Sequence, residues 1–186
     1  MINVLVTGAG GQLGKTIKAL FSKNNYNLNV VFVTKEELDI TNSESTHAFF
    51  LNNKFDYCIN CAAYTNVEQA EKTPEIAFKV NAEGVKYLAK SCKTSDTILI
   101  HISTDYVFDG TQENHTEDEA FSPLSVYGAS KAAGDIVVSL APKFYILRTS
   151  WVIGDGKNFV RTMIDVANKN VSPTVVNDQI GRLTFT

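Results

Sequence analysis

Short apolar runs alternate with amphipathic helical patterns along almost the whole chain, and this alternation limits the folds open to it. Strands separated by helices form βαβ units, which build a parallel sheet with right-handed crossover connections. The sequence therefore predicts an α/β fold with a doubly wound parallel sheet and a site along the carboxyl ends of its strands. The expected strands are residues 2–7, 28–33, 56–60, 97–103 and 144–149, and the expected helices lie near 12–23, 42–53, 75–92, 125–140 and 157–168.

The first expected strand runs directly into a glycine-rich turn. Gly8, Gly11 and Gly14 stand three residues apart, between the apolar run 2–7 and a helical pattern. The first glycine permits a tight turn, the second lets a pyrophosphate approach the backbone, and the third lets the helix lie close to the strand. Free N–H groups at the start of this helix, near Gln12, would face the phosphates. This arrangement predicts the Rossmann fold and a dinucleotide site, and the alternative is a glycine turn with a structural role alone.

The end of the second expected strand bears on the choice of cofactor. A carboxylate about 20 residues past the glycines binds the ribose 2′-hydroxyl of NAD, but this chain has Thr34 and Lys35 there. A hydroxyl and an ammonium suit a 2′-phosphate, so we expect NADPH. The alternative is that Lys35 is a solvated turn residue and that NADH also binds, because Glu36 and Glu37 follow directly.

Tyr127 and Lys131 stand four residues apart in a helical pattern and therefore share one helix face. An ammonium beside a phenol lowers the pKa of the phenol from about 10, so that it can act as a general acid or base. Upstream, the strand 97–103 leads into the hydroxyls of Ser103 and Thr104, at the expected carboxyl edge of the sheet. Tyr-x-x-x-Lys alone also fits an exposed helix face, but with the hydroxyls and the glycine turn it predicts a reductase site.

These motifs resemble those of a known family. The spacing Gly8-x-x-Gly11-x-x-Gly14 with Tyr127-x-x-x-Lys131 is similar to the extended branch of the short-chain dehydrogenase/reductases. Longer segments resemble the dTDP-4-dehydrorhamnose reductases of that branch, namely 38–41 (LDIT), 60–65 (NCAAYT), 103–110 (STDYVFDG), 122–128 (SPLSVYG), 147–152 (LRTSWV) and 178–181 (DQIG). The likeness covers nearly the whole chain.

The resemblance implies an activity and a set of site residues. It implies NAD(P)H-dependent reduction of the 4-keto group of a nucleotide-activated deoxysugar, foremost dTDP-4-dehydro-L-rhamnose to dTDP-L-rhamnose for cell-surface polysaccharide. The implied catalytic residues are Thr104, in preference to Ser103, with Tyr127 and Lys131. The implied cofactor contacts, including those expected above, are Gly8, Gly10, Gly11, Gln12, Leu13, Gly14, Thr34, Lys35, Asp39, Ile40, Ala62, Ala63, Tyr64, Thr65, Asn81, Tyr127 and Lys131. For Asn81, a surface position on its helix is nearly as good an interpretation.

The chain also departs from the pattern of this family. Its members are commonly longer, Leu183 stands where proline is usual, and Asp135 stands where glutamate is common. We expect a dinucleotide-binding domain over residues 1–170 and the start of a shortened substrate-binding region over 171–186, with a homodimer or a separate carboxyl-terminal half as possible partners. Two other functions stay open: a nucleotide-sugar epimerase or dehydratase, and a regulatory module that binds NADP without turnover.

Charge and composition exclude several classes of protein. The net charge is −3 without a basic patch, which argues against a nucleic-acid partner. No apolar run reaches the roughly 18 residues of a membrane span, and the chain opens on a core strand, so we expect a cytoplasmic protein without a membrane partner. Cys58 and Cys61 form a C-x-x-C, but residues three apart on a strand face opposite sides. We therefore expect structural thiols and no metal.

Overall fold

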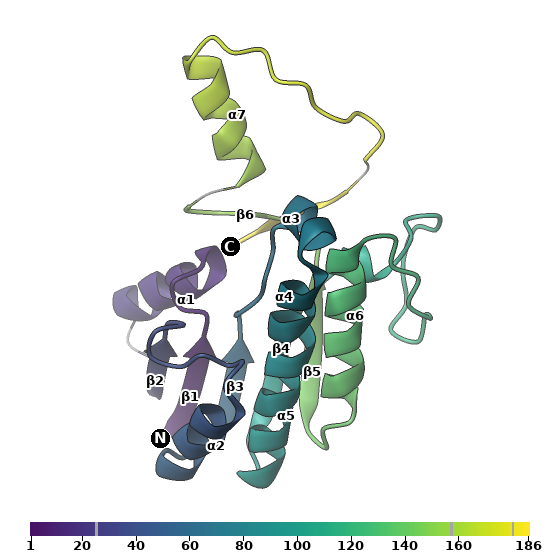
Figure 1. Cartoon of the computed structure of the whole chain (residues 1–186). Helices are drawn as coiled ribbons and strands as arrows, with labels where there is room; N and C mark the ends of the chain where they lie inside the picture. Colours follow the sequence, from purple (N-terminus) through teal and green to yellow (C-terminus); the bar gives the residue numbers. More distant parts are fainter. Residues whose placement is uncertain (25, 157, 180) are drawn as a thin grey trace.

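The computed structural model describes residues 1–24, 26–156, 158–179 and 181–186 and contains a five-stranded parallel sheet (Figure 1). The strand order is β2-β1-β3-β4-β5. Each predicted strand is present, with bounds that differ from the prediction by at most one residue. The strands are β1 (Ile2–Thr7), β2 (Leu28–Val33), β3 (Tyr57–Asn60), β4 (Ile98–Thr104) and β5 (Phe144–Thr149).

The predicted helices are also present, one of them in three parts. α1 (Gln12–Lys23), α2 (Ser43–Asn52) and α6 (Val126–Ser139) match their predictions closely. The helix expected over 75–92 divides into α4 (Pro74–Phe78), a π-helical segment (Lys79–Gly84) and α5 (Val85–Thr94). Prediction from sequence missed α3 (Val67–Lys72), whose first turn is capped by the Asn66 side chain, and the short 3₁₀ turn η2 (Asp105–Val107).

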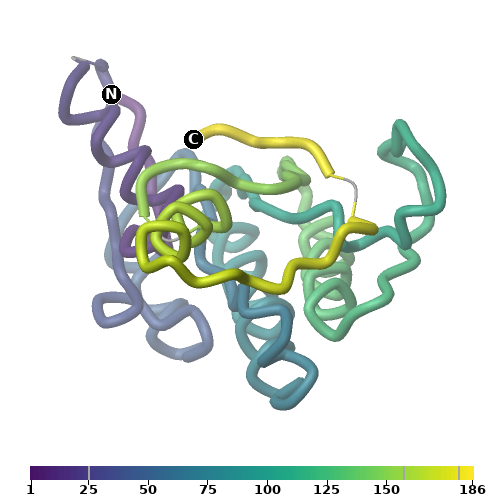
Figure 2. The backbone as a smooth tube through the Cα atoms, turned by 90° about the horizontal axis from the view of Figure 1, so that it is seen from above, coloured from purple at the N-terminus to yellow at the C-terminus, as the bar shows by residue number. Residues whose placement is uncertain are grey.

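A second, smaller sheet crosses above the carboxyl edge of the main one. It pairs β6 (Trp151–Ile153) in parallel with β7 (Leu183–Phe185), and neither strand was predicted. Between them, α7 (Phe159–Asn168) rises above the body of the molecule and returns through a long connection (Figures 1 and 2). The expected helix 157–168 is thus confirmed from Phe159 onward, while Lys157 lies outside the described residues. Ile180, within the segment 178–181, lies outside them too.

The main hydrophobic core lies between the sheet and the helices α2, α5 and α6. Leu5, Cys58 and Leu99 occupy one row across β1, β3 and β4 and are fully buried. They pack with Leu88 from α5 and Val138 from α6, among others. The thiols of Cys58 and Cys92 both lie in this core as free cysteines, as expected for structural thiols.

The opposite face of the sheet is covered only in part. α1 packs there through Phe21, whose ring lies 6.2 Å from the ring of Phe32 on β2. Further across, Ile100 pairs with Tyr145 and Ile102 pairs with Leu147, and these four side chains define what we call the open face. Tyr145 is 60% exposed and Leu147 50% exposed. Parallel sheets are normally covered on both faces, so this apolar surface is an unusual feature of the chain.

Within the described residues, no helix is both long and apolar enough to cross a membrane.

Replacing Leu99 by alanine tests the position of the core. The side chain is fully buried between β4 and the helices, so Leu99→Ala should lower the free energy of unfolding by about 2 to 5 kcal/mol in urea titration. Leu140→Ala is the matched control, because Leu140 is 77% exposed and should change stability by no more than about 0.5 kcal/mol. Equal effects of the two substitutions would contradict this assignment of the core.

Candidate active site

The turn between β1 and α1 brings backbone N–H groups to the carboxyl edge of the sheet. Gly8 has a φ of 67°, and its carbonyl accepts a hydrogen bond of 2.9 Å from the Gly11 N–H. A Cβ on Gly8 would lie 2.6 Å from the Ala62 N, and one on Gly14 would lie 2.6 Å from the turn's own backbone. Beside Gly10 there is more room, with the nearest atom 3.9 Å from an added Cβ. In the described chain no side chain caps α1, so its first N–H groups remain free for an anion.

Gln12 connects this turn to the carboxyl-terminal segments. Its Nε2 donates to the Val152 carbonyl at 3.2 Å, and its Oε1 accepts from Asn158 Nδ2 at 3.2 Å. One turn along α1, the Thr16 hydroxyl lies 3.2 Å from the Thr186 hydroxyl. The Gln12 side chain, expected near a cofactor, is therefore engaged with β6 and the start of α7. Leu13 beside it is half-buried.

The residues expected to select the cofactor follow β2. The Thr34 N–H donates to Glu37 Oε2 at 2.7 Å, and this hydrogen bond lowers the pKa of Glu37. Lys35 is exposed, as a 2′-phosphate ligand must be. Asp39 Oδ1 accepts from the backbone and hydroxyl of Thr41, and Ile40 is buried in the core. An ionised carboxylate thus lies beside the expected phosphate position, which keeps the NADH alternative open.

Asn81 is buried in the π-helical segment and holds the chain that follows β3. Its Oδ1 accepts from the Tyr64 N–H at 2.8 Å, and its Nδ2 donates to the Tyr64 carbonyl at 3.0 Å and to Ser130 Oγ at 2.9 Å. The surface position considered from the sequence is therefore wrong. Through these bonds Asn81 fastens the segment 62–65 (AAYT), expected to line the cofactor, to α6.

Thr104, Tyr127 and Lys131 lie where the end of β4 packs against the first turns of α6. Gly128 allows the close approach, since a Cβ there would collide with the Tyr106 carbonyl. The Thr104 hydroxyl is near enough to Tyr127 to lower the pKa of the phenol, and it accepts a hydrogen bond of 3.2 Å from the Tyr106 N–H. Lys131 is 2% exposed, and its Nζ donates to the Ile102 carbonyl at 2.7 Å. The structure thus brings the three expected catalytic side chains to the carboxyl edge of the sheet.

Residues 2–186 match the model of a protein family described as the RmlD substrate binding domain. The chain belongs to this family. Among curated relatives, this RmlD-family chain is 43% identical over 188 residues to the dTDP-4-dehydrorhamnose reductase of Aggregatibacter actinomycetemcomitans, covering 100% of this chain and 64% of that protein. It is 39% identical to the spore coat polysaccharide biosynthesis protein SpsK of Bacillus subtilis, covering 100% of this chain and 66% of that one. The chain therefore spans less than two thirds of either relative.

Solved structures of longer proteins share its fold. One is a dTDP-4-dehydrorhamnose reductase from Clostridium acetobutylicum, with a TM-score of 0.85 and 42% identity over 90% of this chain and 60% of that one. Another, from Bacillus anthracis, was solved in complex with NADP and gives a TM-score of 0.85 and 39% identity, covering 91% of this chain and 61% of the other. These neighbours confirm the Rossmann fold of the RmlD-family chain.

Burial controls the protonation of Tyr127 and Lys131 in opposite directions. It raises the pKa of Tyr127 to about 12, although the Thr104 hydroxyl opposes the change. Burial lowers the pKa of Lys131 to about 8, with the charge of Asp135 acting against it. The expectation that Lys131 lowers the pKa of Tyr127 is therefore wrong for this chain. The physical reason is that desolvation favours the neutral form of both groups.

Sequence reasoning missed the polar groups beneath Lys131. His101, interpreted only as a packed or hydrogen-bonded strand residue, lies with its Nε2 3.3 Å from Lys131 Nζ. Asp135, noted only as a departure from the usual glutamate, is fully buried and accepts a hydrogen bond of 3.1 Å from Arg148 Nε. A signal was present, because Tyr127, Lys131 and Asp135 are spaced by four residues and so share one face of α6.

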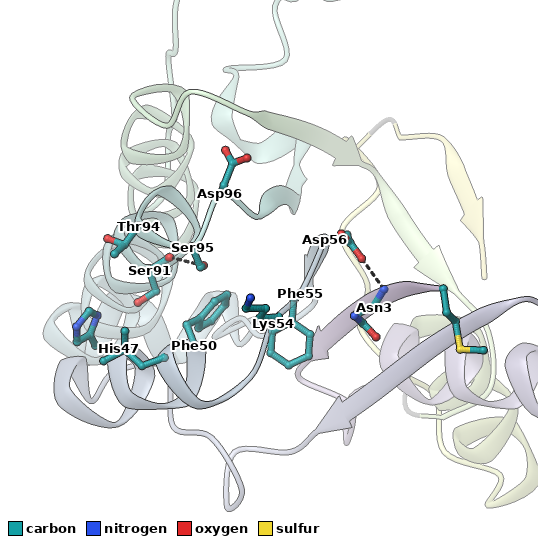
Figure 3. A pocket seen from close by; sticks show the side chains of 12 residues that line it. Asn3, His47, Phe50, Lys54, Phe55, Asp56, Ser91, Thr94, Ser95 and Asp96 are labelled. Atoms are coloured by element: carbon teal, nitrogen blue, oxygen red, sulfur yellow. Dashed lines mark hydrogen bonds between the residues drawn. The ribbon is translucent and has the colours of Figure 1, made fainter.

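A cavity of about 500 Å³ lies at the other edge of the sheet, near the amino ends of the strands. Figure 3 shows its lining, which includes Asn3, His47, Phe55, Asp56 and Asp96. None of the expected site residues is among the residues that line it. Because ligands of such sheets bind beyond the carboxyl ends of the strands, we place the active site at the opposite edge.

Two glycines test whether close backbone contact constrains the glycine turn between β1 and α1. Gly8 and Gly110 both have positive φ, but only Gly8 meets backbone atoms where a Cβ would stand. Gly110→Ala should lower the free energy of unfolding by about 1 to 2 kcal/mol, from the left-handed conformation alone. Gly8→Ala should cost clearly more and should also weaken NADPH binding, measured by fluorescence. Equal costs in both variants would show that contact with Ala62 does not constrain the turn.

Proposed function

We propose that the chain provides the catalytic machinery for reducing the 4-keto group of a nucleotide-activated deoxysugar with NADPH, converting dTDP-4-dehydro-L-rhamnose to dTDP-L-rhamnose. The observation that carries the proposal is that Thr104, Tyr127 and Lys131 lie at the same carboxyl edge of the sheet as the glycine turn. It is supported by 43% identity along the whole chain to a protein named for this reaction.

The residues at the carboxyl edge suit a dinucleotide. The N-terminus of α1 offers free N–H groups to the pyrophosphate, and Gly10 leaves room for its approach. Thr34 and Lys35 would bind the 2′-phosphate, and the segment 62–65 would line the cofactor beyond it. The neighbour from Bacillus anthracis, which binds NADP, supports this choice. When bound, the reduced nicotinamide supplies the hydride for the reaction.

The side chains of the chain itself supply and stabilise the proton. Because burial raises the pKa of Tyr127 to about 12, the phenol holds its proton on Oη at neutral pH, the state that a general acid needs. The Thr104 hydroxyl would hydrogen-bond the substrate oxygen as charge develops on it, and the Lys131 ammonium would stabilise the phenolate that remains.

Two alternative functions, an epimerase or dehydratase and a regulatory module, each predict a different observation. An epimerase or dehydratase would retain its cofactor through purification, whereas a reductase exchanges it in each turnover. UDP-glucose 4-epimerase from Thermotoga maritima shares the fold at 19% identity, which does not favour that activity here. A regulatory module would bind NADP without turnover, and the presence of Thr104, Tyr127 and Lys131 argues against it.

Removing the phenolic hydroxyl tests the role of Tyr127. In Tyr127→Phe, reduction of dTDP-4-dehydro-L-rhamnose, followed by the absorbance of NADPH, should fall by about 10² to 10⁴. NADPH affinity should change little, because the ring and its contact with Tyr106 remain. Near wild-type turnover in this variant would refute the assignment of the proton donor.

The open face supports a second part of the proposal. Residues 1–170 would form the dinucleotide-binding domain and 171–186 the start of the substrate region, with the carboxyl-terminal part of the longer family members packing on the open face. Thr186 lies against Thr16 of α1, the helix that covers the same side of the sheet. The alternative occupant is a second copy of the chain.

Coexpression with part of a longer relative separates these occupants. When coexpressed with the carboxyl-terminal third of the reductase from Aggregatibacter actinomycetemcomitans, the chain should form a stoichiometric complex and gain turnover. Leu147→Lys should abolish the complex by placing a charge on the open face, whereas Leu140→Lys, at the end of α6, should not. If the chain alone sediments as a dimer that only Leu147→Lys dissociates, the second copy is the occupant.

A further inference from the structure

Lys131 carries a charge that the fold has removed from water. The side chain is 2% exposed, and its hydrogen bond to the Ile102 carbonyl satisfies one of its three donors. A buried ammonium is costly unless an opposite charge lies close to it. The identity of that opposite charge determines whether Lys131 remains protonated.

His101, the nearest ring, cannot supply this charge. Asn60 Oδ1 accepts from the Ala62 N–H at 3.2 Å and from the Thr7 hydroxyl at 2.7 Å, so Asn60 Nδ2 donates to His101 Nδ1 at 3.0 Å. Burial, followed by the charge of Lys131, keeps the pKa of His101 well below its usual range. The neutral ring therefore carries its proton on Nε2 and presents a donor to the ammonium, which is a donor as well.

Among the described residues, Asp135 is the carboxylate whose charge acts on Lys131. It lies one turn beyond Lys131 on α6 and is fully buried. Its Oδ2 accepts from Arg148 Nε, and its Oδ1 makes no hydrogen bond among the described residues. Burial raises the pKa of this carboxyl, while the Ser103 hydroxyl and the positive charges of Arg148 and Lys131 oppose the change. Asp135 Oδ1 lies 3.8 Å from His101 Nε2, which itself lies 3.3 Å from Lys131 Nζ. This carboxylate oxygen and the ammonium thus converge on the same ring nitrogen.

The geometry points to Asp135 as the counter-ion that keeps Lys131 protonated in the site, and so as a positioning residue for the reaction. This inference rests on the function proposed above. Asp135 acts through Lys131 rather than on substrate, and His101, fixed by Asn60, holds the two side chains apart.

The other groups that face Lys131 do not replace this carboxylate. Burial raises the pKa of Cys61, at the end of β3, to about 12, so the thiol is uncharged. Tyr127 likewise holds its proton. Arg148 on β5 adds a second positive charge, so Asp135 serves two cations and the cluster keeps a net positive charge. Such a cluster favours the phenolate that forms when Tyr127 donates its proton.

The pH dependence of NADPH binding tests the inference directly. Fluorescence titration between pH 6 and 10 should show affinity falling as Lys131 loses its proton. In Asp135→Asn the midpoint should move down by about 1 to 3 pH units, as for the loss of a nearby opposite charge. Asp135→Glu should restore the wild-type midpoint. Arg148→Gln removes the second cation that shares Asp135, so the midpoint should move upward.

Asp96→Asn is the matched control, because it breaks an exposed pair with Lys143 away from the site and should leave the midpoint in place. If Asp135 were only structural, Asp135→Asn would weaken binding by the same factor at every pH, and that result would overturn the inference. Should Asp135→Asn fail to fold, an unmoved midpoint in Arg148→Gln would overturn it equally.

Unfolding measurements separate this inference from the proposed function. The pKa of Lys131 is about 8 in the folded chain and about 10.4 when unfolded, so the unfolded state binds more protons between these values. Stability should therefore rise with pH across this window in wild type relative to Lys131→Met. In Asp135→Asn the rise should begin at lower pH. If NADPH does not bind, the proposed function fails, while an unchanged onset in Asp135→Asn would refute the counter-ion role by itself.

Discussion

The close approach of α6 to two backbone carbonyls is the constraint on which the site depends. A Cβ at Gly128 would collide with the Tyr106 carbonyl, and one at Gly134 with the Asn81 carbonyl. Because both positions lack a side chain, α6 packs directly on the turn η2 that follows β4 and on the π-helical segment. That contact sets the height and rotation of the helix. The face that carries Tyr127, Lys131 and Asp135 therefore points into the sheet edge rather than into water.

The parallel sheet then determines which groups α6 meets. Since all five strands run the same way, Thr7, Asn60 and Thr104 stand at their carboxyl ends, and His101 in the middle of β4 lies level with Asn60. Buried hydrogen bonds join Thr7, Asn60 and His101. The row reaches Lys131, whose Nζ lies 3.3 Å from His101 Nε2. The polar row crosses the sheet beneath the site, so the orientation of a side chain on α6 is tied to residues of the first strand. The site is built on the side of the sheet that α6 covers. The open face, on the other side, leaves apolar surface uncovered.

Much of this could be predicted because it is local. Apolar runs bounded by glycine or polar residues located the five strands to within a residue, and the spacing of Gly8, Gly11 and Gly14 located the turn. The strands β6 and β7 were missed because each has three residues and depends on a partner about 30 residues away. Whether Asn81 belongs to the site or to the surface stayed open in the sequence for the same reason: its partners, Tyr64 and Ser130, are distant in sequence.

The pKa of Tyr127 depends on its burial in the fold, which the sequence motif alone does not reveal. Tyr-x-x-x-Lys implies a cation beside a phenol, but burial raises the pKa of Tyr127 and lowers that of Lys131, so it opposes the charged form of both groups. In the reductive direction this is no disadvantage, since a general acid must hold its proton until the substrate oxygen becomes basic. Stabilisation is needed after the proton transfer, when Tyr127 is a phenolate in a desolvated site. A positive charge must then already be in place, and a lysine whose own pKa has fallen to about 8 holds it near neutral pH only while a carboxylate lies beneath it. The reactivity of the tyrosine is thus limited by a residue that never touches it.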